Sequence, residues 1–507
     1  GFGHRWGGVM PHRTIRSLVQ NTALLLLTFL CTTDAFLTHS LLPLALPHFK
    51  NTSPLRPSAT TSPRMSLFPS GSGVTGAVSK SRGVVSVETP GELDNSDAFV
   101  LDTMTDRVPT KIIGRTVEYN TADLDTEALK GMEAIADEMR GNKKITGLSK
   151  GPNVEHWNKC LKPYLDEGTT WGSLPWYVGE TYVYHRLLEA SGFWDKGSKG
   201  EGLDIFAKEK KEALDLAMPQ VEARAAVCAA AEGKWSGAEA RAMLLMSLWG
   251  NQGDSSLFTI QDIADNAGRA SGDDKILVDE VDDVWNLICA AAERKGGKAC
   301  VHFLNDNSAL ELASDLLLAH YLLSTNRVSK VVFNLKPYPF FVSDATPPDV
   351  STTLSAMAAS PDAHTSRLAS DLKHHLETGA LTLTHDGPLN LFLASPEPMW
   401  CMPAAARAPL REEADLAVAK GDLMYRKLLG DRTFEATEAF DDIVSYFPTP
   451  LLSLRTCKSP VAVGMRKDKV EELRRTHPTW MVDGQCGMVQ LCVPPPGGEV
   501  TVGGGGT

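Results

Sequence analysis

The spacing of apolar residues divides the chain into a helical part and a mixed part. From about residue 121 to residue 267, apolar positions recur three and four residues apart, as in "TEALKGMEAIADEMRG". Strong helix formers dominate in "FAKEKKEALDLAMPQVEARAAVCAAAEG". After Gly272, short β-rich runs alternate with helical stretches: "KILVD", "VDDVWNLICAAAERKGG", "ACVHFLN", "ALELASDLLLAHYLLST" and "VSKVVFNLK". The pattern therefore predicts helices first, and then strands and helices in alternation.

Alternation at this pitch predicts a parallel sheet that is covered by helices on both faces. We therefore expect an α/β protein with an all-α N-terminal domain at residues 100–268 and a three-layer, Rossmann-like parallel-sheet domain at residues 269–493. The runs "ADLAVAKGD", "KSPVAVGM" and "CGMVQLCV" are expected to supply later strands. Ligands of such sheets bind beyond the carboxyl ends of the strands.

The N-terminal segment has the composition of a leader. Residues 1–36 are predicted to be signal-peptide-like, because basic residues after Met10 precede a short apolar core and then small polar residues up to Ala35. Residues 37–95 are predicted to be a disordered transit-like segment, because residues 37–87 lack Asp and Glu and are dense in Ser, Thr and Pro. This order resembles the bipartite leader of proteins imported into complex plastids, so a plastid location is expected. A cytoplasmic protein with a disordered tail behind a mis-called start is the alternative.

Composition narrows the classes of partner. The net charge of -12 and the absence of a clustered basic run argue against nucleic-acid binding. We expect no membrane segment in the mature protein. The nine cysteines are scattered without a CxxC pair, which predicts reduced, mostly packed thiols. The tail at residues 494–507, rich in Pro and Gly, is expected to be disordered.

Polar residues that could bind a metal follow two of the expected strands. The strand "CVHFL" ends at Asn305, Asp306 and Asn307, where a helix begins at once. A helix cap explains such residues. A hard divalent ion takes about six oxygen ligands and would need more from a neighbouring strand end. Asp344, in the turn after "VVFNLKPYPFFV", supplies one if the two strands are neighbours. The residues alone leave the cap and the metal both open.

Two further turns carry cations. The segment "LRTCKSP" carries Arg455 and Lys458 just ahead of an expected strand. An arginine can clamp a phosphate through two parallel hydrogen bonds, and a lysine acts as a point charge. A solvated helix face would also carry such charges. Acids and cations on successive strand ends of one sheet nevertheless favour a site for a metal and an anion. The segment "KGDLMYRKLLGDR" contributes Lys420, Asp422, Arg426 and Arg432.

Four of these segments resemble, in order, the signatures of a known family. The segments "DNSALELASDLLLA", "LKPYPFFVSDATPPDV", "KGDLMYRKLLGD" and "LRTCK" are similar to those of the DUF89 damage-control phosphatases. The resemblance is to subfamily III, also named acidic residue methyltransferase, whose Arg-Thr-x-Lys hallmark falls here on Arg455, Thr456, Cys457 and Lys458. Upstream, "LPWYVGETYVYHRLLEASGFW", "LWGNQGD" and "ILVDEVDDVW" agree in the same order, so the resemblance covers roughly residues 105–492.

The resemblance implies a ligand set. It implies a divalent metal, Mn²⁺, Ni²⁺ or Co²⁺, held by Asp306, Asn307 and Asp344. It implies that Arg455 orients its turn, and it gives Asp315 no role beyond a structural one. The chain departs from the family at three positions, with Ala309 for the usual glycine, Met424 for the usual asparagine and His185 for an arginine. The implied substrate-binding residues are Glu311, Asp422, Leu423, Met424, Tyr425, Arg426 and the phosphate-binding Lys458.

The function expected from these residues is metal-dependent hydrolysis of a phosphate monoester. The implied substrate is a small sugar phosphate resembling fructose 1-phosphate, and Lys458 and Arg426 would share its charge with the metal. Attack by water or by a carboxylate such as Asp344 is left open. One alternative is an S-adenosylmethionine-dependent protein-glutamate carboxyl methyltransferase, although such enzymes usually place a Gly-rich turn after the first strand, where the turns here are acidic. Another alternative is a non-catalytic binding protein that uses the helical part.

Overall fold

The computed structural model describes residues 77–80, 83–86, 91–251 and 273–494. The chain divides into two units, Gly1–Arg64 and Met65–Thr507, and every described residue belongs to the second. The predicted signal peptide, most of the predicted transit segment and the tail beyond residue 494 lie outside the described residues.

The first part of the described chain is helical, as predicted. Its core contains Trp157, Tyr182 and Leu187, each at most 1% exposed. The Asp125 carboxylate accepts a hydrogen bond from the amide of Ala128 and thereby caps a helix. The elements are α2 (Ala98–Asp102), the π-helix η1 (Thr103–Ile112), α3 (Ile113–Tyr119), α4 (Thr126–Arg140), α5 (Val154–Glu167), η2 (Trp171–Ser173) and α6 (Trp176–Ser191).

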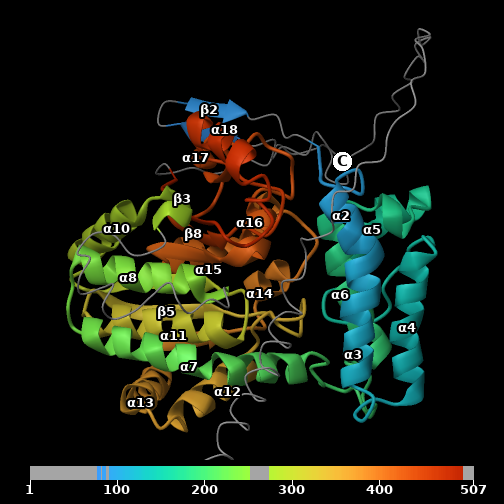
Figure 1. The fold of residues 1–507 in the computed structure, drawn as a ribbon, viewed down its shortest axis with the longest axis horizontal. Helices are drawn as coiled ribbons and strands as arrows, with labels where there is room; N and C mark the ends of the chain where they lie inside the picture. The colour runs from blue at the N-terminus through green and yellow to red at the C-terminus, as the bar shows by residue number, and fades with distance from the viewer. Residues whose placement is uncertain (1–76, 81–82, 87–90, 252–272, 495–507) are drawn as a thin grey trace, which may run out of the picture. The chain divides into compact units, whose positions relative to one another are not determined.

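The next helices cover one face of the sheet. The buried residues of α7 (Ala207–Ala231) and α8 (Gly237–Leu248) share one hydrophobic cluster with the strands, and Figure 1 shows both helices beside α11 over that face. The short η3 (Trp249–Asn251) follows α8. Helical periodicity identifies these segments as helices but does not identify their packing partner. The other helices in this cluster are α10 (Val281–Arg294), α11 (Ala309–Ser324), α12 (Pro347–Ala358) and α13 (Ala363–Thr378).

The sheet confirms the α/β prediction. Its seven strands lie in the order β3-β9-β8-β7-β4-β5-β6, and every neighbouring pair is parallel except β8 with β9. A short helix, η5 (Asp273–Lys275), precedes the first of them. The strands are β3 (Ile276–Asp279), β4 (Ala299–Leu304), β5 (Val328–Asn334), β6 (Leu381–Thr384), β7 (Leu416–Lys420), β8 (Leu451–Thr456) and β9 (Gly487–Cys492).

Side chains along the strands alternate between two cores, as strand geometry requires. On β7, Leu416 and Val418 belong to the cluster with α7 and α11, whereas Ala417 and Ala419 belong to the other cluster. This second cluster also contains the helical part of the chain, so the sheet has a helical layer on each face. Its helices are α14 (Pro388–Leu393), η6 (Met399–Cys401), α15 (Ala404–Glu413), α16 (Gly421–Leu428) and α17 (Phe440–Val444), while α18 (Lys467–Thr476) packs in a third, smaller cluster.

The structure differs from the sequence predictions at two segments. The predicted strand "KSPVAVGM" is a loop, because Pro460 has no N–H for a ladder and the carbonyls of Ser459 and Val461 accept hydrogen bonds from Arg455 instead. The predicted disordered segment 37–95 contains the antiparallel strands β1 (Ala77–Lys80) and β2 (Gly83–Ser86). Composition averaged over a long window does not resolve strands of four residues.

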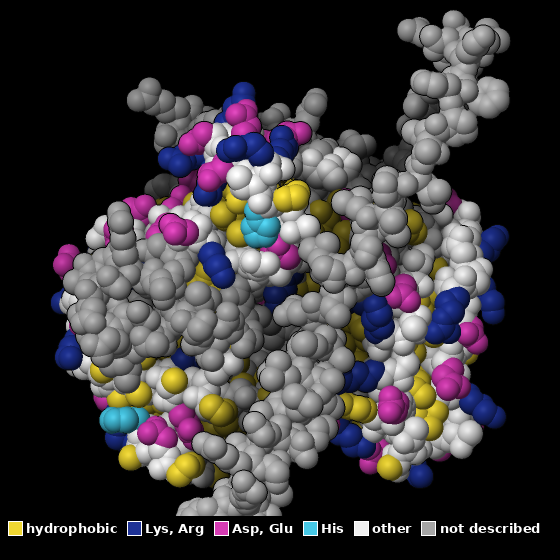
Figure 2. All heavy atoms as spheres, in the orientation of Figure 1, with side chains coloured by type: hydrophobic (Ala, Val, Ile, Leu, Met, Phe, Trp, Pro, Cys, Tyr) yellow, Lys and Arg dark blue, Asp and Glu magenta, His cyan; other side chains and the backbone are white. Residues whose placement is uncertain are grey.

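Two further predictions concern the whole chain. The eight cysteines within the described residues are free thiols, as the scattered spacing predicted. Among the described helices, none combines the length and the apolar character needed to cross a bilayer. On the face in Figure 2, basic and acidic side chains are interspersed among the coloured residues.

Candidate metal and anion site at the strand ends

Four adjacent strands carry the candidate residues at their carboxyl ends. In the order β8-β7-β4-β5, these ends lead to Lys458, Asp422, Asp306 and Asp344. Strands β4 and β5 are neighbours, and Asn307 forms an isolated bridge with Asp344. The turns that the sequence separates by up to about 150 residues therefore meet at one edge of the sheet, which is the edge where α/β proteins bind ligands.

Backbone hydrogen bonds join the turn after β4 to the turn after β5. The amide of Ala345 donates to the carbonyl of Asp306 at 2.7 Å, and the amide of Ser308 donates to the carbonyl of Ser343 at 2.7 Å. These bonds fix the two acidic turns relative to each other. Asp306 and Asp344 are consequently buried, with exposed fractions of 4% and 2%.

The Asn307 side chain links three parts of the site. Its amide nitrogen donates to Oδ2 of Asp306 and to Oε2 of Glu311, both at 2.8 Å. Its amide oxygen accepts from the hydroxyl of Ser343 at 2.5 Å. Helix α11 has Ser308 as its N-cap, and no side chain there makes a capping hydrogen bond. The helix-cap explanation of Asp306 and Asn307 is therefore wrong.

Buried cations compensate most of the acids at the site. Asp344 pairs with Lys336 at 2.8 Å, and Asp422 pairs with Arg455 at 2.7 Å. Lys420 lies 3.5 Å from Glu311 and 3.1 Å from Asp315, so the second pair gives Asp315 the structural role that was predicted. The side chains of Lys336 and Lys420 are completely buried, so their ammonium groups contact these acids and not solvent.

Asp306 is the exception among these acids. It forms no ion pair with any residue that the structure describes, and its Oδ1 atom accepts no hydrogen bond there. Burial, followed by the nearby charges of Asp344 and Glu311, raises the pKa of Asp306 well above its usual value. Burial also raises the pKa of Asp344 to about 6. An uncompensated buried carboxylate is costly, and a divalent cation on these oxygens would remove the cost. The residues present fit such an ion.

Two glycines allow the chain to pack against these acids. A Cβ at Gly421 would lie 1.7 Å from Oδ2 of Asp306, and the residue has a φ of +76°. A Cβ at Gly250 would lie 2.7 Å from the Cα of Glu311. The backbone of the "KGD" turn thus lies directly on the Asp306 carboxylate, which no residue with a side chain would permit.

The Arg-Thr-x-Lys segment folds around Asp422. Oδ1 of Asp422 accepts from Nε of Arg455 at 2.7 Å and from the amide of Lys458 at 3.1 Å. The completely buried Arg455 also donates to Ser459, so it orients its turn, as was predicted. Burial lowers the pKa of Lys458, while the charges of Glu311, Asp422 and Asp306 oppose that shift. Lys458 therefore lies near enough to these acids for their charges to act on it.

Arg426, from the predicted substrate-binding run, is engaged by residues other than the acidic turns. Arg426 pairs with Glu180 at 2.7 Å and with Asp431 at 2.8 Å, and its guanidinium lies 3.4 Å from the ring centre of Trp176. It fastens α16 to α6. Leu423, Met424 and Tyr425 are buried as well. From this run, Asp422 lies close enough for its charge to act on Asp306.

Three cations carry little or no sequence signal for the site. Lys336 lies in the segment "LKPYPFFVSDATPPDV", but the resemblance gave it no role, and Lys420 was noted only as one charge among several. Arg107 is on the π-helix η1, and its charge acts on Lys458 and on Tyr184. Extended π-helical turns are often functional, which is the one local signal that could have indicated Arg107.

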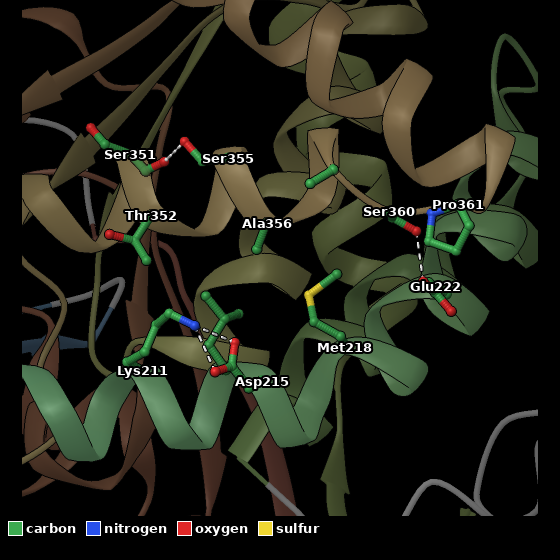
Figure 3. Close-up of a pocket in the computed structure, with 12 residues that line it drawn as sticks. Lys211, Asp215, Met218, Glu222, Ser351, Thr352, Ser355, Ala356, Ser360 and Pro361 are labelled. Carbon is green, nitrogen blue, oxygen red and sulfur yellow. Dashed lines mark hydrogen bonds and ion pairs between the residues drawn. The ribbon is translucent and has the colours of Figure 1, made fainter.

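Other concave or ligand-like features lie elsewhere. A groove of about 600 Å³ lies between α7 and α12. In Figure 3, Lys211 pairs with Asp215 and Ser360 donates a hydrogen bond to Glu222. The polar groups of this groove satisfy one another, so we assign the chemistry to the strand ends.

Three groups within the described residues bring His, Cys or acidic ligand atoms within 4.8 Å of one another: His156 with Cys160 and Glu397, Cys300 with His302 and Glu413, and Glu232 with His320 and Asp371. The Asp306 set includes an amide and differs from these groups.

The fold and this site define an α/β protein whose strand ends suit a cation and an anion. A model of the damage-control phosphatase ARMT1-like domain matches residues 103–473. The chain is 31% identical over 433 residues to the Damage-control phosphatase ARMT1 of Xenopus laevis, which covers 78% of this chain and 96% of that protein. For the protein of the same name from Homo sapiens, the identity is 27%, with 79% and 98% covered.

The chain belongs to the damage-control phosphatase ARMT1-like family. A solved DUF89 family protein from Pyrococcus horikoshii aligns with 78% of this chain and 98% of its own, at 12% identity and a TM-score of 0.39. Family membership and the ligand-like groups together imply a divalent metal.

Proposed function

We propose that the protein is a metal-dependent phosphatase that hydrolyses phosphate monoesters of small sugar phosphates. The observation that carries the proposal is Asp306, a buried carboxylate without an ion pair in the described part of the chain, among Asp344, Glu311 and Asn307. We assign the metal to Asp306, Asn307 and Asp344, with Mn²⁺, Ni²⁺ or Co²⁺ as candidates. When bound, the ion would stabilise the negative charge that develops on the phosphoryl oxygens.

The remaining residues support an anion next to this carboxylate cluster. The backbone amide of Lys458 donates a hydrogen bond to Asp422, which also accepts one from Arg455. The ammonium group of Lys458 would bind the phosphate. Arg107 would add a second positive charge from the helical part. Ser343 is exposed, so its hydroxyl oxygen can accept a hydrogen bond from a hydroxyl group of a small polar ester.

The test is a screen for phosphate release from phosphosugars and phosphonucleotides with Mn²⁺, Co²⁺ or Ni²⁺. We expect release that needs the metal and that falls at least about 100-fold in Asp306→Asn. Asp362→Asn is the matched control, since asparagine caps α13 as well as aspartate does and activity should not change. Lack of release from every sugar phosphate, or equal rates for Asp306→Asn and the wild type, would overturn the proposal.

Two measurements separate this proposal from its alternative. Calorimetry with S-adenosylmethionine should show no tight binding, whereas tight binding without any affinity for Mn²⁺ would favour the carboxyl methyltransferase.

For the location, we propose plastid import. A fluorescent fusion to residues 10–95 should enter plastids, and cytosolic fluorescence would contradict that proposal.

A further inference from the structure

A second group of metal-ligating side chains lies at the opposite end of α11. His320 is in α11, Asp371 is in α13, and Glu232 is the C-cap of α7. Their ligand atoms all lie within 4.8 Å of one another. Glu311 and His320 are nine residues apart along α11, which corresponds to about 14 Å of helix. The group is therefore separate from the acids at the strand ends.

His320 is a buried side chain without a hydrogen-bond partner. It is 2% exposed, and neither Nδ1 nor Nε2 forms a hydrogen bond within the described residues. Oε1 of Glu232 is 3.6 Å from Nε2, which is too long for such a bond. Leaving a buried polar group unpaired destabilises the folded state. Burial lowers the pKa of His320, which favours the neutral imidazole that binds metals.

A second imidazole stands next to this group. His375 follows Asp371 by four residues on α13, so both side chains lie on the same face of that helix. The ring centres of His375 and His320 are 5.6 Å apart. Two imidazoles on one tetrahedral zinc ion would place their ring centres about 5 Å apart. The ring spacing suits one shared ion, although His375 is outside the set of ligand atoms that lie within 4.8 Å of one another and would have to turn toward it.

Arg367 orients the two carboxylates of the group. Its guanidinium lies 2.6 Å from Oε2 of Glu232 and 2.7 Å from Oδ2 of Asp371. Oε1 of Glu232, which lies 3.6 Å from Nε2 of His320, also accepts a longer hydrogen bond from Arg367 at 3.3 Å. Carboxylates that bind metals are commonly held by such an outer partner. Arg367 could simply neutralise the two acids, with no metal involved. That explanation does not account for His320, which is buried without a hydrogen-bond partner in the described part of the chain.

We propose that His320, His375, Glu232 and Asp371 form a second metal site, of the zinc class, which joins α7, α11 and α13. Two imidazoles and two carboxylates are the nitrogen and oxygen ligands that a tetrahedral zinc ion accepts. The side chains of Glu232 and Asp371 are 34% and 37% exposed, so an ion can enter from solvent while His320 forms the floor of the site.

The experiment uses the full chain with Asp306→Asn, so that the strand-end site does not contribute. After chelation and dialysis, Zn²⁺ is titrated by calorimetry, and thermal unfolding is followed with and without the ion. We expect one bound equivalent and a rise in Tm. Adding His375→Ala should weaken zinc binding at least about tenfold and abolish the rise in Tm. Adding His374→Ala should change neither, because this neighbour on α13 is exposed.

The outcomes separate the two sites. Equal zinc affinity in the His374→Ala and His375→Ala proteins would overturn the second site, and so would the absence of binding in both. His320→Gln, at the buried position, should reproduce the loss seen with His375→Ala. In the otherwise wild-type chain, His375→Ala should leave the rate of phosphate release unchanged. A loss of phosphate release together with unchanged zinc affinity would count against the assignment.

Discussion

Gly421 is the position where a single added methyl group should test the site most sharply. In Gly421→Ala, the new Cβ would lie 1.7 Å from Oδ2 and 2.6 Å from Cγ of Asp306. Contacts under 3.0 Å do not persist, so the Asp306 carboxylate must move by more than about 1 Å or the turn must open. A displacement of 1 Å at a reacting centre costs about 100-fold in rate. We therefore expect kcat/KM for phosphate release to fall about 100-fold.

The substitution also strains the backbone, and that effect can be separated. Gly421 has a φ of +76°, where a non-glycine residue costs roughly 1–2 kcal/mol. Gly379 ends α13 with a φ of +77°, and a Cβ added there would have no atom within 4 Å, so Gly379→Ala carries the strain without the contact. Gly379→Ala should lose about 1 kcal/mol of unfolding free energy in urea, and Gly421→Ala should lose more, because the contact with Asp306 adds to the strain. Only Gly421→Ala should lose activity, and activity within threefold of the wild type would refute the reasoning.

Four further predictions follow from buried charges and from backbone strain. Ala309 has a φ of +54°, so Ala309→Gly should raise the unfolding free energy in urea by about 0.5–1 kcal/mol. Arg426→Met should lower it by about 3–5 kcal/mol, because Glu180 and Asp431 would stay buried without their partner. Asp306→Asn should keep or raise the Tm of the metal-free protein while activity is lost, since the acid has no ion pair among the described residues. Burial lowers the pKa of Lys427 to about 7, against about 10.5 in the unfolded chain. Between these two pH values the unfolded chain binds more protons than the folded one. The unfolding free energy should therefore rise with pH in this range, by up to about 1.4 kcal/mol per pH unit.

Each of these predictions has a comparison that can contradict it. Asn326→Gly is the control for Ala309, because asparagine tolerates its φ of +58°; an equal gain in both variants would contradict the strain argument. Asp344→Asn should lower Tm, unlike Asp306→Asn, since it leaves Lys336 buried without its partner. Equal losses in these two variants would contradict the compensation described for Asp344. The pH dependence assigned to Lys427 should be absent in Lys427→Met, and an unchanged slope there would assign it to another group.

The sequence by itself determined the class of fold and which polar residues follow its strands. Alternating apolar runs are local signals, and each reports the type of one element, so many helices, five of the seven main-sheet strands and the carboxyl-end turns could be predicted, whereas β6 and β8 were missed. The resemblance then implied roles for Asp306, Asp344 and Lys458 within those turns. The loop after β8 was mistaken for a strand because its apolar residues resemble a strand until the hydrogen bonds to Arg455 are known.

Only the tertiary structure decided which charges meet. Lys336 and Lys420 compensate particular acids because β5, β7 and α11 pack together, and Arg426 turns to Glu180 because α16 lies against α6. Asp306 stands out only when every neighbour is in place, and so does the unpaired His320. Burial and charge balance depend on contacts between residues far apart in the chain, which no local pattern contains.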